Sequence, residues 1–264
     1  MKKLLTAVLG LALLFALAAC GSDEESSADS KGSQFNLVED GKFTYASSGE
    51  YKPFSYMNED GTMTGFDIKV GEAIAGELGL EPSQQKYKFN AIVEGVKTGR
   101  FDAAVASHTI TDKRKEHVSF STPYYYSGAQ IFTRPDSDAQ SLEDLEGLEV
   151  AVSKGSTYAD YADEVTDDVV TYDSDITALE ALTKEKHDAV ITDFLTGKEA
   201  IGSGNFDIVG KDMIERSEQA IAVAKDSEEL LDAINEALET LRENGTLEKL
   251  SKEYFGEDIT TKPE

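Results

Sequence analysis

Segments with strand-like and helix-like patterns alternate along this chain, and the alternation restricts its possible folds more than any other feature of the sequence. A first series consists of a strand, a helix, a strand, a helix and a strand, at residues 42–47, 65–80, 86–89, 90–99 and 101–107. In the helix at 65–80, apolar side chains recur at helical spacing and Gly79 is placed to cap the C-terminus. Helices that alternate with apolar, β-branched strands predict an α/β fold whose sheets are largely buried.

A second series lies between two extended connections, at residues 128–136 and 219–226. It opens with a capping-box pattern at Ser141 and Asp144. A strand, two helices and a closing strand follow, at residues 148–153, 156–164, 175–186 and 187–193, and the chain ends in amphipathic helices at 227–245 and 246–256. Two connections with a compact unit between them predict one lobe inserted into another, with a two-stranded hinge.

The first twenty residues are read as a targeting segment rather than as part of the fold. Lys2 and Lys3 precede an apolar run of signal-peptide length, which ends at Cys20, the only cysteine of the chain. The sequence Leu-Ala-Ala-Cys resembles the lipobox of bacterial lipoproteins, in which the cysteine is lipidated; the alternative is an ordinary signal peptide with a cysteine near its cleavage site. An acylated Cys20 leaves no thiol for a disulfide. Residues 21–34 are polar and acidic, which favours a flexible acidic tether.

Charge and motif content exclude several classes of function. The chain has 25 Lys and Arg residues against 51 Asp and Glu residues, which argues against nucleic acid or an anionic membrane surface as a partner. Its histidines, His108, His117 and His187, are too scattered for a metal cluster. We find no nucleophile-and-base pattern and no cofactor fingerprint. The sequence therefore predicts a protein without a metal or cofactor and without catalytic residues.

Five segments carry a resemblance to a known family. They are "YKPFSYMNEDGTMTGFDI", "GVKTGRFDAAVA", "TITDKRKEHVSFSTPYYYSG", "SLEDLEGLEVAVSKGST" and "LRENGTLEKLSKEYFG". From about Lys42 to Gly256, their order and spacing resemble the family-3 extracellular solute-binding proteins, the polar amino-acid binding proteins of ABC importers. The resemblance implies a two-lobed, type II periplasmic-binding-protein-like fold with two hinge strands. We expect lobe 1 at residues 35–130 and 224–264 and an inserted lobe 2 at residues 131–223.

The resemblance also implies how lobe 1 binds a ligand. Arg114 matches the arginine that pairs with the α-carboxylate of an amino acid, and a guanidinium suits this role because its two parallel hydrogen bonds fix a planar carboxylate. Without the surrounding motif, the simpler interpretation of Arg114 is a surface residue that forms an ion pair. Thr111 would cap the same helix start. Ser107 and Thr109 occupy positions whose backbone and hydroxyl groups reach the ligand in relatives.

In lobe 2 the resemblance points to a helix start and to an acidic residue. Ser156 and Thr157 begin a helix whose N–H groups favour an anion, although both residues are equally suited to simple N-capping. Asp193 matches the family acid that receives the α-ammonium group. Because Arg114 and Asp193 belong to different lobes, a bound zwitterion would bridge the lobes and stabilise the closed form.

Aromatic side chains are expected to surround the ligand side chain. Tyr51, Phe54 and Phe89 fall where relatives have aromatic walls, although Phe54 also suits an ordinary core position. Phe89 stands where tryptophan is more frequent. We expect His108 to point away from the ligand if Ser107 and Thr109 point toward it. The tyrosines at residues 124–126 are expected to pack near the hinge rather than to touch ligand.

The leading hypothesis is a monomeric, lipid-anchored receptor that delivers a polar L-amino acid to the permease subunits of an ABC transporter. Arginine-like, glutamine-like and cystine-like ligands all remain open. An amino-acid sensing subunit and a catalytic relative, such as a dehydratase on the same fold, are the alternatives. Gly21 follows Cys20 where an inner-membrane retention aspartate is common in two-membrane bacteria, so the protein is expected on the outer face of a Gram-positive cell membrane.

Overall fold

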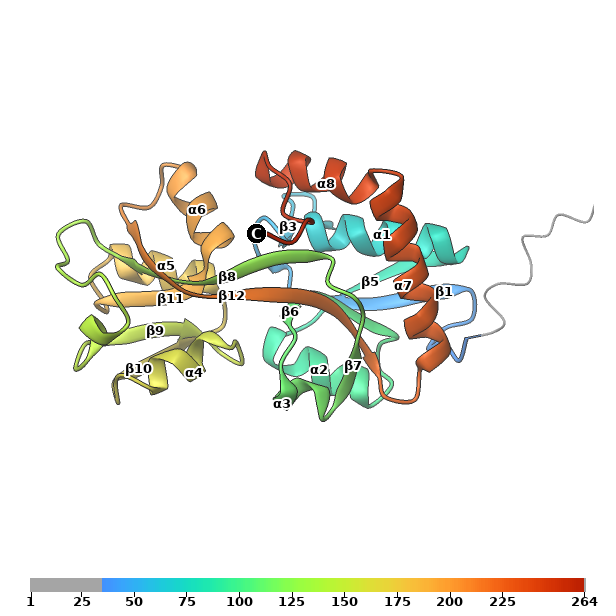
Figure 1. Cartoon of the computed structure of the whole chain (residues 1–264), viewed down its shortest axis with the longest axis horizontal. Coiled ribbons are helices and arrows are strands. Elements are labelled where there is room, and N and C mark those ends of the chain that lie inside the picture. Colours follow the sequence, from blue (N-terminus) through green and yellow to red (C-terminus); the bar gives the residue numbers. More distant parts are fainter. Residues whose placement is uncertain (1–34, 264) are drawn as a thin grey trace, which may run out of the picture.

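A mixed sheet of nine strands runs through the whole molecule in the computed structural model, which describes residues 35–263 (Figure 1). Its order is β10-β9-β11-β8-β12-β6-β1-β5, and β7 pairs with β12. The strands are β1 (Lys42–Ser47), β5 (Glu81–Lys86), β6 (Ala103–Thr109), β7 (Val118–Phe120), β8 (Tyr125–Thr133), β9 (Val150–Ser153), β10 (Val169–Tyr172), β11 (Ala189–Asp193) and β12 (Val209–Ala224). A second sheet consists of β2 (Glu50–Tyr51), β3 (Ser55–Met57) and β4 (Met63–Thr64).

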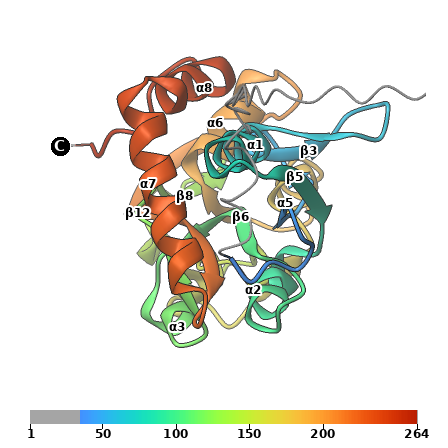
Figure 2. The ribbon, with the colours of Figure 1, turned by 90° about the vertical axis from the view of Figure 1, so that its right-hand side faces the viewer.

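Helices gather around the two ends of the large sheet and define two lobes (Figure 1). Lobe 1 contains α1 (Phe66–Leu78), α2 (Phe89–Lys97), α3 (Asp112–Lys115), α7 (Glu228–Glu243) and α8 (Thr246–Phe255). Lobe 2 contains α4 (Tyr158–Asp163), α5 (Asp175–Thr183), α6 (Phe194–Gly202) and a 3-10 turn at Glu143–Leu145. Figure 2 shows α7 and α8 close to α1, against which both pack. No helix within residues 35–263 combines the length and the apolar character needed to cross a membrane.

The strands of lobe 1 are covered on both faces. Along β6, Ala103 and Val105 join the apolar cluster beneath α1, whereas Ala104 and Ala106 join the cluster beneath α2. Successive strand residues point to opposite faces, so this division shows a strand buried from both sides. Lobe 2 has two further apolar clusters of its own. The predicted α/β architecture with two lobes is therefore confirmed.

Two long strands, β8 and β12, connect the lobes. They pair antiparallel, and Tyr125 lies opposite Gln219 at the lobe 1 end. Lobe 2 begins on β8 at Ala129, where pairing with β11 starts, and Ala129 lies opposite Glu215. The strands cross between the lobes over residues 125–129 and 215–219, slightly N-terminal to the lobe boundaries expected from the sequence.

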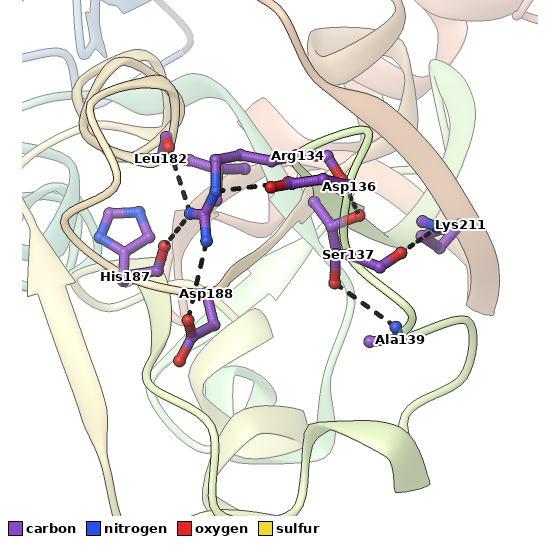
Figure 3. A network of polar contacts seen from close by, with 9 residues as sticks. Arg134, Asp136, Ser137, Ala139, Leu182, His187, Asp188 and Lys211 are labelled. Atoms are coloured by element: carbon purple, nitrogen blue, oxygen red, sulfur yellow. Dashed lines mark hydrogen bonds and ion pairs between the residues drawn. The ribbon is translucent and has the colours of Figure 1, made fainter.

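The lobe 2 end of β8 is fixed by a polar network around Arg134 (Figure 3). Arg134 Nη1 donates to the carbonyl of His187 at 2.6 Å, and Nη2 lies 3.8 Å from the carboxylate of Asp188. Both partners belong to the turn between α5 and β11. Arg134 thus ties the end of a connecting strand to the body of lobe 2.

Local patterns predicted most elements, and two of the exceptions, β5 and β10, lie at the edges of the large sheet. The expected strand at residues 86–89 is wrong, because β5 ends at Lys86 and Phe89 begins α2. The strand β5, with the sequence EPSQQK, lies at the sheet edge and pairs with β1 alone, so it shows no apolar alternation. The sequence patterns also did not predict β10 at the other edge, the polar N-terminal part of β12, the helix α6 or the small sheet of β2, β3 and β4. Edge strands need little apolar burial, and their signal is correspondingly weak.

Candidate functional site

A cavity of about 530 Å³ lies between the lobes. Lobe 1 lines it with residues from β2, the β5–α2 connection, β6 and α3, and lobe 2 lines it with residues from the starts of α4 and α5. The lining residues are Ser48, Glu50, Tyr51, Lys86, Tyr87, Lys88, Phe89, Asn90, Ala91, Ser107, Thr109, Arg114, Ser153, Lys154, Ser156, Thr157, Tyr158, Asp173, Ser174 and Asp175. The cavity therefore contains seven of the nine predicted ligand-binding residues, and Phe54 and Asp193 lie outside its lining.

Arg114 is positioned at the junction of the lobes by contacts on both sides. The hydroxyl of Thr111 accepts from the Arg114 amide at 3.2 Å and so caps α3, as predicted. Within the guanidinium, Nη1 donates to the carbonyl of Thr109 at 2.9 Å and Nη2 donates to the carbonyl of Gly155 in lobe 2 at 3.2 Å. Burial lowers the pKa of Arg114 to about 10, so the group stays charged at neutral pH. Backbone carbonyls thus orient the charged guanidinium of Arg114 in the cavity.

Gly155 in lobe 2 lies close to lobe 1 beside Arg114. Its φ of +82° lies in the left-handed region, and a Cβ at this position would lie 2.8 Å from Asn90 Cβ at the start of α2. A side chain at position 155 would therefore both strain the backbone and collide with α2. A glycine here lets the two lobes meet beside Arg114.

Ser107 differs from the expectation in the direction of its side chain. Its φ is +57°, and although the residue lines the cavity, its hydroxyl donates to Asp67 on α1 at 2.8 Å. Thr109 lines the cavity. His108 is buried, lies outside the cavity lining and stacks on Phe89 with ring centroids 4.7 Å apart. Its burial, and then the charge of Arg114, hold the pKa of His108 well below its usual range, so the ring is neutral.

The aromatic wall of the cavity lining consists of Tyr51, Tyr87, Phe89 and Tyr158, of which Tyr87 and Tyr158 were not predicted from the sequence. Phe89 also lies 5.9 Å from the guanidinium carbon of Arg114. The expectation that Phe54 forms part of this wall is corrected: the side chain is fully buried and packs between the rings of Tyr51 and Tyr125, both 4.9 Å away. Phe54 supports the wall from the core.

Asp193 is buried behind the cavity surface, and this placement differs from the direct ligand contact predicted for it. One carboxylate oxygen accepts from the amides of Leu195 and Thr196 and caps α6, and the other accepts from the hydroxyl of Ser127. Burial raises the pKa of Asp193 to about 7. Burial, and then the charge of Asp193, raise the pKa of Tyr51.

The lobe 2 side of the cavity is polar. Ser156 and Thr157 line it at the start of α4, and Thr157 occupies the N-cap position without a side-chain capping bond. The hydroxyl of Ser156 donates to the carbonyl of Ser153 at 2.7 Å. Asp175, a further lining residue that the sequence analysis missed, accepts from the hydroxyl of Ser153 at 2.9 Å. The only sequence signal near Asp175 is Ser174, the N-cap of α5. An N-cap residue marks where a helix begins, but it does not show that the helix start faces the cavity.

Comparison with known proteins decides the family. Residues 43–257 match the bacterial extracellular solute-binding proteins, family 3. The chain belongs to this family. Among its relatives, the L-cystine-binding protein TcyJ of Escherichia coli (strain K12) is 31% identical over 264 residues, covering 98% of this chain and 97% of that protein. The arginine-binding extracellular protein ArtP of Bacillus subtilis (strain 168) is 33% identical over 263 residues, covering 97% of this chain and 98% of that protein.

Solved structures of amino-acid-binding proteins have the same fold. An ancestral arginine-binding protein bound to arginine superposes with a TM-score of 0.78 and 32% sequence identity, covering 82% of this chain and 99% of that chain. In this chain the cavity lies between two lobes joined by β8 and β12, where a type II binding protein has its ligand cleft. The resemblance stated from the sequence motifs is thereby confirmed at the level of family and fold.

Proposed function

We propose that this protein captures a polar L-amino acid outside the cytoplasm and delivers it to the permease subunits of an ABC transporter, with no catalytic step. One observation carries the proposal: Arg114 lies in the interlobe cavity, held by backbone carbonyls of both lobes. A guanidinium fixed in this way offers its remaining donors to a planar carboxylate. Family membership and the binding functions named for the relatives support the same role.

The proposed binding mode places the main-chain groups of the ligand at the lobe junction. The α-carboxylate pairs with Arg114, assisted by Thr109 and by the start of α4 at Ser156 and Thr157. The α-ammonium group is attracted by Asp193, whose charge also raises the pKa of Tyr51 in the cavity wall. A zwitterion bound in this way contacts both lobes and stabilises their closed arrangement.

The ligand side chain is proposed to lie between Tyr51 and Phe89. Charges of both signs line the cavity nearby, because Glu50 pairs with Lys86 at 2.7 Å and Lys88 lies 3.8 Å from Asp173. These pairs are solvent-exposed and are compatible with arginine-like, glutamine-like and cystine-like ligands. The named ligands of TcyJ and ArtP, cystine and arginine, are the first candidates.

A thermal-shift screen of the twenty amino acids with ornithine and cystine tests the proposal. A ligand present at a hundred times its dissociation constant adds about 2.7 kcal/mol to the free energy of unfolding. We expect one or a few polar amino acids to raise the melting temperature, and calorimetry then confirms stoichiometric binding. A screen in which no amino acid raises the melting temperature contradicts the proposed function.

We further propose that a lipid on Cys20 anchors the protein to the outer face of a Gram-positive cell membrane. The targeting segment, Cys20 and the tether at residues 21–34 lie outside the described residues, so this proposal rests on the lipobox-like sequence. Replacing Cys20 with Ala should release the protein from the membrane fraction or leave it unprocessed. Normal processing with unchanged membrane retention would contradict the lipid anchor.

A further inference from the structure

A buried carboxylate on α1 contacts the strand that carries the predicted ligand-binding residues. Asp67 is fully buried, and both of its oxygens accept hydrogen bonds from hydroxyl groups. Oδ2 accepts from the Ser107 hydroxyl at 2.8 Å, and Oδ1 accepts from the Tyr124 hydroxyl at 2.6 Å. The same Tyr124 oxygen accepts from the Ser107 amide at 3.0 Å. Asp67, Ser107 and Tyr124 therefore form a closed ring of hydrogen bonds.

This ring holds Ser107 in a conformation that serine rarely adopts. Ser107 is one of two non-glycine residues with positive φ within residues 35–263, and its φ is +57°. Left-handed backbone at a residue with a Cβ persists only where surrounding contacts determine it. Here both the amide and the hydroxyl of Ser107 are bound, one to Tyr124 and the other to Asp67. The contacts that determine its conformation are thus the members of the ring.

The conformation of Ser107 changes the course of β6 at the edge of the cavity. His108 lies opposite Ala220 on β12, but the next pair toward the start of β6 is Ala104 opposite Ala222, so β6 has extra residues and bulges. The bulge precedes Thr109, whose carbonyl accepts from the Arg114 guanidinium at 2.9 Å. The orientation of Arg114 therefore depends on where the bulge places Thr109.

We propose that Asp67 and Tyr124 are positioning residues of the ligand site, which set the end of β6 through Ser107 and so orient Thr109 and Arg114 toward the ligand. This inference rests on the proposed amino-acid binding function. Neither Asp67 nor Tyr124 lines the cavity, so their effect on binding is indirect. It should fall on the main-chain groups shared by all amino-acid ligands, and not on the recognition of the ligand side chain.

The neighbouring tyrosine provides a matched control. Tyr125 is as fully buried as Tyr124, but in the described part of the chain its hydroxyl has no hydrogen-bond partner. Tyr124→Phe removes one donor and one acceptor of the ring, whereas Tyr125→Phe removes a hydroxyl that makes none of the three hydrogen bonds of the ring. Both variants keep the aromatic ring and the packing of the core.

Calorimetry with the amino acids found in the screen tests the proposal at a temperature where both variants are fully folded. We expect Tyr124→Phe to lower the affinity for every amino acid roughly tenfold without changing their order of affinity. The affinities of Tyr125→Phe should stay within about twofold of those of the parent. Asp67→Ala should weaken binding similarly, and Asp67→Asn should restore part of it because an amide can keep both contacts. A folded Tyr124→Phe variant that binds within twofold of the parent overturns the proposal.

Amide hydrogen exchange separates this inference from the proposed function. If the parent binds no amino acid, the proposed function is wrong, but the exchange rate of the Ser107 amide still reports on the ring. Faster exchange at Ser107 in Tyr124→Phe, with the parental rate in Tyr125→Phe, supports the positioning of Ser107 by the ring. Equal rates in all three proteins overturn it.

Discussion

Arg114 is the residue on which ligand capture depends most directly. In a closed cleft, Arg114→Ala would leave the ligand carboxylate buried without a partner, so we expect affinity to fall roughly a hundredfold or more, or about 2.7 kcal/mol. Arg114→Lys should restore only part of the loss, because an ammonium keeps the charge but not the planar two-point geometry. Calorimetry measures both variants. Binding of the cognate amino acid by Arg114→Ala within about threefold of the parent would show that Arg114 does not grip the carboxylate.

Asp193 should make the stability of the ligand-free protein depend on pH. Burial raises the pKa of this carboxyl from 3.8 to about 7, so between these values the folded protein binds a proton that the unfolded chain releases. The contribution of Asp193 to the free energy of unfolding therefore increases as pH falls from about 7 toward 4, by at most about 1.4 kcal/mol per pH unit. Asp193→Asn removes this contribution.

Urea unfolding at pH 7.5 and pH 5.5 measures the effect. The parent should gain more free energy of unfolding than Asp193→Asn on acidification. Asp67, Asp102 and Asp175, the other buried carboxyls with raised pKa values, are present in both proteins, so the difference between the two gains reports on Asp193 and its coupling to Asp175. Equal gains in the two proteins would show that Asp193 is ionised in the folded state throughout this range.

At the scale of elements, the turn between β9 and α4 must come close to the start of α2. Gly155→Ala would place a Cβ 2.8 Å from Asn90 Cβ, so we expect amino-acid affinity to fall about tenfold because the lobes cannot approach fully. Gly204→Ala is the matched control, since Gly204 also has positive φ, +71°, but has no atom within 4 Å of an added Cβ. Calorimetry should show a loss of amino-acid affinity for Gly155→Ala and not for Gly204→Ala. Equal affinities in the two variants would contradict a role of the close approach between Gly155 and Asn90 in lobe closure.

At the scale of the whole molecule, β8 and β12 are the connections about which the lobes can rotate. Amino-acid ligands that contact both lobes stabilise the closed arrangement, so a saturating cognate ligand should reduce the radius of gyration in solution scattering. The same measurement on Arg114→Ala at an equal ligand concentration serves as the control. Scattering profiles of the parent that coincide with and without saturating ligand would argue against a hinge.

Features of the structure that depend on a few neighbouring residues could be predicted from the sequence. The strand at residues 42–47, the Gly79 cap of α1 and the Thr111 cap of α3 follow from periodicity and capping within a few residues, and the structure contains all of them. The segments shared with the family determined the two-lobed fold and the placement of Arg114 at the cavity, because their order along the chain is itself a long-range constraint.

Tertiary structure decided the features that depend on distant partners. Phe54 and Tyr51 are both aromatic residues of one short segment. Packing against Phe66, Tyr125 and Phe255 places Phe54 in the core, whereas Tyr51 lines the cavity. The family resemblance predicted that the Ser107 hydroxyl reaches the ligand, but in the structure it donates to a carboxylate 40 positions earlier in the chain. Periodicity describes the neighbours along the chain, whereas the direction of a polar side chain is set by the hydrogen-bond partner that folding brings to it.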